Sequence, residues 1–151
     1  MQNNKNLKQQ KPEKIEIKFV NTWATNNIVE LYKAGGWWRE QYDPSGIPNL
    51  IKGSFAFAVA VDTSSGMAIG MGRVISDGVS DGYIQDVVVL PKYRGMGIGA
   101  RILKILLNYC LENELHWIGL IAEPGTKSFY SPLGFKVLPG EPMVYLRLLE
   151  D

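Results

Sequence analysis

The sequence predicts an α/β fold of the mixed α+β kind: a mostly antiparallel central sheet with one parallel βαβ crossover and helices on both faces. Strand-like runs at residues 55–61, 67–75 and 83–90 follow one another with only short turn-forming stretches between them, which predicts antiparallel hairpins. A segment with helical periodicity then separates 83–90 from the strand-like run 117–122. Strands joined through a helix in this way run parallel.

The elements before this sheet are less regular. Residues 15–20 alternate apolar and polar side chains and predict a first strand. Residues 25–34 predict a short helix, with Thr25 as its cap and a Gly-Gly pair as its stop. The prolines and glycines of 37–53 predict an irregular segment with a helical turn near Leu50.

The later elements follow from apolar periodicity. Large and small apolar residues alternate over 55–61, which predicts a strand covered on both faces. We expect strand 117–122, a short helix at 126–131, and a closing hairpin of 135–138 with 144–149. The helix of the crossover has an apolar stripe formed by Ile98, Ile102, Ile105, Leu106 and Tyr109.

Length and composition predict one small domain. We expect a disordered polar leader over 1–14 and a single domain over 15–151. The net charge of +1, with acids and bases interspersed, gives no nucleic-acid footprint, and no apolar run is long enough to span a membrane. The single cysteine, Cys110, excludes an internal disulfide and suggests a reducing, cytoplasmic location. With one histidine, His116, no metal cluster of familiar spacing can be built, and we expect no metal.

The segment 91–100 predicts a site for a phosphate group. Pro91 ends the apolar strand, and Arg94 precedes glycines at 95, 97 and 99 as a helix begins. The first N–H groups of a helix have no partner within it, and glycine lets an anion approach them. We expect a cradle made of backbone N–H groups, with positive charge from Arg94.

One interpretation of these glycines is a dinucleotide-binding turn. Residues 95–100 fit the loose pattern GxGxxA, and Glu123 follows the next apolar run as a candidate ribose ligand. Against it, residues 91–94 separate the strand from the first glycine, and the strands upstream look antiparallel. Only about fifty residues follow, too few for a second mononucleotide-binding half. No Gly-Lys-Ser/Thr follows, which excludes a Walker loop.

The spacing Arg94-x-x-Gly97-x-Gly99 resembles the pyrophosphate loop of the GNAT acyltransferase superfamily. Residues 129–135, Phe-Tyr-Ser-Pro-Leu-Gly-Phe, resemble a second motif of that superfamily at the usual distance. The resemblance spans about residues 53–149 and implies the GNAT fold with acetyl-CoA as co-substrate. It implies that the cofactor's pyrophosphate binds at Arg94, Gly95, Met96, Gly97, Ile98, Gly99 and Ala100.

The resemblance implies an N-acetyltransferase that moves acetyl from acetyl-CoA to an amine in a ternary complex. The backbone amides of Val88, Val89 and Leu90 correspond to those that hold the thioester carbonyl and pantetheine arm. Tyr130 occupies the position of the tyrosine that faces the departing thiolate. The alternative for Tyr130 is a packing role against Phe135.

Asp86 is a candidate to accept the amine proton or to orient the amine. It follows Gln85 in an apolar strand, and two adjacent strand residues are expected to face opposite sides. A carboxylate there is costly to bury unless it is paired or functional. The alternatives are a cross-strand pair with Arg73 or hydrogen bonds to a nearby turn. Residues 83–89 also resemble the matching strand of glucosamine-6-phosphate N-acetyltransferases, although Gln85 replaces the first acid of their pair.

The acceptor side of the site is expected at Trp37, Trp38, Tyr83 and Glu123. The two tryptophans are candidates for an aromatic wall that attracts an ammonium group, or for a lid over the core. Residues 31–38 resemble a segment of a GNAT group that includes arylalkylamine acetyltransferases. Glu123 replaces an asparagine common in that superfamily, so it either faces the amine or is a solvated loop acid.

These observations predict a cytoplasmic acyltransferase acting on a small-molecule amine, with neither nucleic acid nor membrane as partner. A homodimer is left open. A non-catalytic acyl-CoA-binding sensor on the same fold is the alternative from another functional class.

Overall fold

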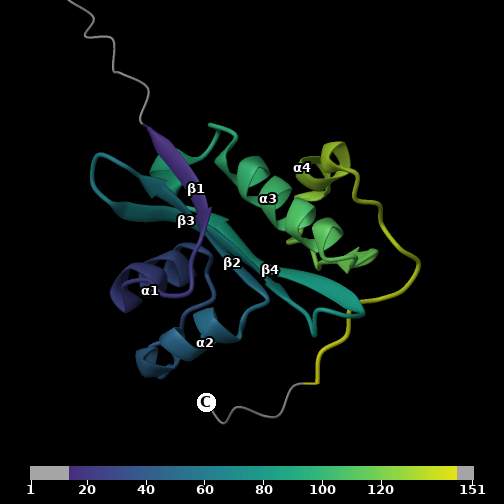
Figure 1. Ribbon diagram of the computed structural model, residues 1–151, viewed down its shortest axis with the longest axis horizontal. Helices are drawn as coiled ribbons and strands as arrows, with labels where there is room; N and C mark the ends of the chain where they lie inside the picture. The colour runs from purple at the N-terminus through teal and green to yellow at the C-terminus, as the bar shows by residue number, and fades with distance from the viewer. Residues whose placement is uncertain (1–13, 146–151) are drawn as a thin grey trace, which may run out of the picture.

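A computed structural model describes residues 14–145 of the chain. Its centre is a sheet of five strands in the order β1-β2-β3-β4-β5 (Figure 1). Neighbours are antiparallel from β1 to β4, whereas β4 and β5 are parallel and are joined through a helix. This confirms the predicted mixed sheet. The strands are β1 (Ile15–Phe19), β2 (Ala56–Asp62), β3 (Met67–Ile75), β4 (Asp81–Val89) and β5 (Trp117–Gly119).

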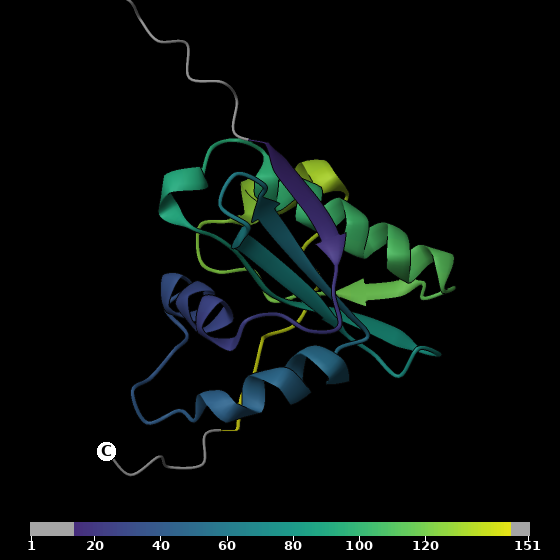
Figure 2. The ribbon, with the colours of Figure 1, turned by 60° about the vertical axis from the view of Figure 1, so that its left-hand side comes forward.

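Helices cover both faces of the sheet. Helices α1 (Thr25–Ala34) and α2 (Ile47–Gly53) lie on one face, and α3 (Ile98–Glu112) and α4 (Lys127–Tyr130) lie on the other (Figure 2). Each face has its own hydrophobic core, so the sheet is buried between two helical layers. A short 3₁₀ turn at Pro44–Gly46 precedes α2, and another at Ser131–Leu133 follows α4. A third, Pro91–Tyr93, precedes the loop that leads into α3.

Strand β2 lies inside the sheet, between β1 and β3, and is buried along its whole length. Its larger side chains, including Phe57 and Val59, pack in the core beneath α1 and α2. Its alanines, including Ala58 and Ala60, face α3. The small alanine side chains therefore lie on the α3 face, as the predicted two-sided burial of residues 55–61 requires.

The segment 37–53 is more helical than its composition predicts. Asp43 accepts a hydrogen bond from the Ser45 backbone N–H and caps the 3₁₀ turn that leads into α2. Ile47 and Ile51, four residues apart on α2, are both buried and fix this short helix to the core. At the start of α1, Thr25 is already helical and makes no capping bond, so the predicted cap is wrong.

The C-terminal part departs most from expectation. Strand β5 ends at Gly119 rather than at residue 122, and it pairs only with the first three residues of β4. Residues 135–138 form no strand, and Val137 and Leu138 are exposed. Strand β5 is short, so it offers few backbone groups with which residues 135–138 could pair. Most of the other expected strand, 144–149, lies outside the described residues. The expected leader over 1–14 lies outside them except for its last residue.

Within the described residues, no helix is long and apolar enough to cross a membrane.

Candidate active site

The site is built around a β-bulge in β4. Where the pairing of β3 with β4 shifts register, Asp86 and Val87 together lie opposite the single Gly72 of β3. Asp86 has a φ of 61°, which is rare for a residue other than glycine. A bulge of this kind turns one side chain out of the regular alternation of a strand. The bulge therefore sets the side of the sheet that the Asp86 side chain faces.

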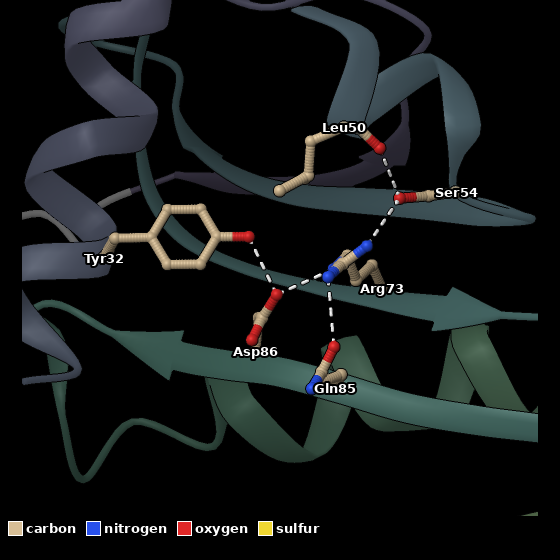
Figure 3. Close-up of polar contacts among 6 residues, drawn as sticks. All are labelled: Tyr32, Leu50, Ser54, Arg73, Gln85 and Asp86. Atoms are coloured by element: carbon tan, nitrogen blue, oxygen red, sulfur yellow. Dashed lines mark hydrogen bonds and ion pairs between the residues drawn. The ribbon is translucent and has the colours of Figure 1, made fainter. Parts of the chain in front are cut away.

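Gln85 and Asp86 face the same partner, although they are adjacent in sequence. The Arg73 Nε donates to Asp86 Oδ2 at 2.7 Å, and Arg73 Nη2 donates to Gln85 Oε1 at 3.0 Å (Figure 3). The expectation that the two residues face opposite sides of the strand is wrong. The bulge breaks the regular alternation of side chains at Asp86, so Asp86 turns to the same side as Gln85. The predicted pairing of Asp86 with Arg73 is confirmed.

A second donor reaches the same carboxylate from α1. The Tyr32 hydroxyl donates to Asp86 Oδ2 at 2.7 Å. Arg73 also contacts the Ser54 hydroxyl at 3.5 Å, and that hydroxyl donates to a backbone carbonyl of α2. Asp86 thus belongs to a polar network that links α1, α2, β3 and β4 (Figure 3). Only about 15% of its side chain is exposed.

A cavity of about 410 Å³ opens beside this network. Its walls come from β4, the segment after β5, α4 and the loop after α1. Its charged lining residues are both acids, Asp86 and Glu123. The full lining is Trp37, Tyr83, Ile84, Gln85, Asp86, Val87, Leu120, Ile121, Glu123 and Tyr130.

Of the residues expected on the acceptor side, three meet in this cavity. Trp37, Tyr83 and Glu123 line it, and Trp37 Nε1 donates to Glu123 Oε1 at 3.3 Å. Trp38 does not line it; its ring packs against Tyr32 and Tyr42 instead. The adjacent tryptophans therefore have different surroundings.

Tyr130 lines the cavity from α4. Its ring packs edge-on against Phe135, with centroids 5.8 Å apart, so the expected packing contact is present. Within residues 14–145, no hydrogen bond to its hydroxyl is found. Burial, and then the nearby Glu123 carboxylate, raise the pKa of Tyr130 above its ordinary value of 10.0. The hydroxyl is therefore protonated at neutral pH and able to donate a hydrogen bond.

The glycine-rich loop before α3 has the form of an anion cradle. Gly95 and Gly97 have φ angles of 78° and 76°, and no other atom lies within 4 Å of where their Cβ atoms would be. Gly97 O accepts the N–H of Arg101, the first bond of α3. The N–H groups of the three residues between them have no carbonyl partner within the helix. The first turn of α3 contains no acid, so an anion meets no nearby negative side chain there.

Two groups near this loop are already engaged. Arg94 Nε donates to Val89 O at 2.8 Å, and its Nη2 lies 3.5 Å from Ala34 O. The Leu90 N–H donates to Ile69 O at 2.8 Å, so it is not free to bind a thioester carbonyl. Because N–H directions alternate along a strand, the Val89 N–H points away from β3, on the side where β5 has ended.

Sequence reasoning did not find Tyr32 as a site residue. It lies on the apolar face of α1 among Ile28, Val29 and Leu31, and its pattern is that of an ordinary core residue. Tyr32 lies 54 residues before Asp86 in the sequence, although its hydroxyl contacts the Asp86 carboxylate. No local signal in the sequence indicates such a contact.

A family model described as an acetyltransferase (GNAT) domain matches residues 53–137 of the chain. The match covers the sheet from β2 onward, the glycine loop and α4. These elements form the cradle and the walls of the cavity other than Trp37.

Individual relatives agree with this match. An uncharacterized N-acetyltransferase, ycf52, of Porphyra purpurea is 30% identical over 128 residues, covering 82% of this chain and 74% of that protein. A chloroplastic serotonin N-acetyltransferase of Oryza sativa subsp. japonica is 32% identical over 80 residues, covering 53% of this chain and 40% of that protein. A solved GNAT-family acetyltransferase from Streptococcus pneumoniae is 27% identical with a TM-score of 0.71, covering 89% of this chain and 99% of that structure.

Proposed function

The chain belongs to the GNAT acetyltransferase family, and we propose that it transfers acetyl from acetyl-CoA to the primary amine of a small cationic molecule. The observation that supports this most is that the fold combines an open N–H cradle with a cavity lined by a carboxylate held by two donors. An anionic cofactor suits the first, and an ammonium group suits the second.

The cradle of residues 95–100 is the proposed site of the cofactor's pyrophosphate. Its two glycines with positive φ leave the space next to the backbone open, and the helix N-terminus favours negative charge. Arg94 is proposed to support this loop through its bonds to the backbone of β4 and α1. We assign the thioester carbonyl to the Val89 N–H, because the Leu90 N–H is already bonded.

When bound, acetyl-CoA supplies the acetyl group as a thioester. A C–N bond forms from the amine nitrogen to the acetyl carbon, and the C–S bond breaks. The ammonium first loses one proton to become a free amine, and the nitrogen loses a second as the amide forms. The sulfur gains one of these two protons, and the other is released to solvent. We assign proton donation toward the sulfur to the protonated hydroxyl of Tyr130. Asp86 and Glu123 are the acids placed to hold the amine or to receive its proton.

The proposed acceptor is an amine with an aromatic or apolar body. Two acids give the cavity negative charge, while Trp37, Tyr83 and Tyr130 provide aromatic walls. A relative named as a serotonin N-acetyltransferase supports the same class of acceptor. An acceptor that carries a phosphate group would bring further negative charge toward these two acids, so we expect it to bind poorly.

Release of CoA in the presence of candidate amines tests this proposal. We expect serotonin and phenethylamine to be acetylated faster than spermidine, glycylglycine or glucosamine 6-phosphate. Release of CoA with none of these amines, alongside tight binding of acetyl-CoA, would favour the non-catalytic sensor instead. Binding of a nicotinamide cofactor in place of acetyl-CoA would favour the dinucleotide alternative.

The cellular location is a separate proposal. The single cysteine favours a reducing compartment such as the cytoplasm. The rice relative is named as chloroplastic, so a plastid-like setting is the competing expectation. Fractionation of cells that express the native chain distinguishes the two.

A further inference from the structure

We propose that Tyr32 and Arg73 are positioning residues that fix one oxygen of the Asp86 carboxylate, so that the other oxygen binds the acceptor as an ammonium ion. Neither residue touches the substrate in this proposal; both act through Asp86. The inference rests on the proposed function, because it concerns the amine that the acetyl group would reach.

The geometry separates the two carboxylate oxygens. Tyr32 Oη and Arg73 Nε both donate to Asp86 Oδ2, each at 2.7 Å. Oδ1 accepts no hydrogen bond from any residue of the described part of the chain, and Figure 3 shows it directed away from both donors. Asp86 also lines the cavity. One oxygen is therefore committed to the protein, and the other retains its acceptor capacity.

The backbone places Asp86 at a local energetic cost. A residue other than glycine at a φ of 61° carries a steric cost that glycine would not. An ion pair with Arg73 alone requires no such conformation, since cross-strand pairs form in regular strands. The bulge, however, brings Asp86 within reach of α1 and of the cavity at the same time. The strain is thus associated with a carboxylate that faces a binding space.

Tyr32 is a permanent donor in this arrangement. Burial, and then the charge of Asp86, raise the pKa of Tyr32 well above its ordinary value of 10.0. The hydroxyl therefore stays protonated throughout the physiological range. The ring packs against Trp37, with centroids 6.3 Å apart, and so also supports a wall of the cavity.

Arg73 carries a positive charge that offsets the charge of Asp86, but it does not itself line the cavity. It donates to Asp86 and Gln85, contacts Ser54, and is about 16% exposed. The groups of the cavity lining that can carry charge or titrate are Tyr83, Asp86, Glu123 and Tyr130. Because Arg73 is paired with Asp86, Glu123 adds a negative charge that no cation of the lining offsets, so the lining favours a cation over a neutral ligand of the same shape.

The variant Tyr32→Phe tests the inference, because it keeps the ring and removes only the donor. Affinity is measured for phenethylamine and for phenethyl alcohol, which differ chiefly in the charged group. In the wild type we expect the amine to bind more tightly. In Tyr32→Phe we expect this preference to fall by about fivefold to tenfold, because the less restrained Asp86 side chain must be ordered when the amine binds. With phenethylamine as acceptor, KM should rise more than kcat falls, and KM for acetyl-CoA should be unchanged.

Tyr93→Phe is the matched control. Tyr93 Oη donates to the buried Asp62 at 2.8 Å, so the control also removes a tyrosine–aspartate hydrogen bond, outside the cavity lining. We expect it to leave the preference for the amine unchanged. Asp86→Asn should reduce that preference by more than Tyr32→Phe does, with Glu123 as the acid that remains in the lining. An equal loss in Tyr32→Phe and Tyr93→Phe would show a merely structural role and overturn the inference.

The outcomes separate this inference from the proposed function. If the wild type releases no CoA with any amine, the proposed function fails. If the wild type acetylates phenethylamine and Tyr32→Phe keeps the full preference for the amine, this inference alone fails.

Discussion

Two tyrosine hydroxyls near the cavity differ in their surroundings. That of Tyr32 is bound to Asp86, whereas that of Tyr130 has no hydrogen-bond partner among residues 14–145. Both have a raised pKa, and burial is the largest cause for each. The bound hydroxyl suits a holding role, and the unbound one suits donation to a group that arrives with the substrates.

Replacing Tyr130 by phenylalanine tests that donation. The ring contacts with Phe129 and Phe135 survive, and only the donor is lost. We expect kcat to fall by at least about tenfold, with a smaller change in KM for acetyl-CoA, since the donor is needed chiefly as the sulfur gains charge. Steady-state kinetics measure both values.

Tyr109→Phe provides the control for Tyr130→Phe. The Tyr109 ring packs against Phe19 and Phe55, away from the cavity lining. We expect this variant to keep the wild-type kcat. A Tyr130→Phe enzyme with the wild-type kcat would restrict Tyr130 to packing and leave protonation of the sulfur to water.

At the scale of elements, the loop before α3 determines cofactor binding in this account. In Gly97→Val, a branched side chain would occupy space that is open beside the helix N-terminus. We expect acetyl-CoA affinity, measured by calorimetric titration, to fall by more than about tenfold, or 1.4 kcal/mol. Gly66→Val introduces comparable backbone strain, because Gly66 has a φ of 72° with equally open surroundings in the β2–β3 turn. It should keep wild-type affinity, and equal affinities in all three proteins would place the cofactor elsewhere.

A second element-scale link connects the end of β2 with the turn before that loop. Asp62 accepts hydrogen bonds from Ser64 and from the Tyr93 hydroxyl, and these bonds lower the pKa of Asp62 below its ordinary value of 3.8. Its stabilising effect is therefore present above pH 3.8 and is lost as the pH falls through the lower folded-state pKa.

Asp62→Asn tests this link. We expect a lower free energy of unfolding than the wild type at neutral pH, with a difference that narrows as the pH falls below 3.8. Urea unfolding at a series of pH values measures it. A difference that stays constant into the acid range would show that the charge of Asp62 contributes nothing.

For the whole molecule, local patterns predicted the sheet and its helices well. Turn residues between alternating runs gave the antiparallel order of β2, β3 and β4, and the bounds of α1 agree with the predicted 25–34. Helix α2 was predicted only as a helical turn near Leu50, because seven residues are too few to show a clear periodicity.

The candidate site was predictable only in part, for a physical reason. Tyr130, Asp86, Trp37, Tyr83 and Glu123 carry side chains whose chemistry marks them in the sequence, and all five line the cavity. The bulge has no comparable mark, since it is a shift in pairing between two strands. The contact between α1 and β4, and the different surroundings of the adjacent tryptophans, also depend on tertiary packing.

The proposed transfer without a covalent acyl-enzyme involves the whole molecule. Cys110, the one cysteine of the sequence, lies on α3 with its side chain buried in the core, away from the cavity lining. Direct transfer in a ternary complex therefore requires both substrates to occupy the molecule together, one at the glycine loop and one at the cavity.

Mass spectrometry after reaction with acetyl-CoA that carries a deuterated acetyl group tests the central claim most directly. With phenethylamine as acceptor, we predict that the label appears on the amine nitrogen in proportion to the CoA released, while the protein itself carries none. Label bound to the protein, or CoA released without a labelled amine, would contradict direct acetyl transfer to an amine.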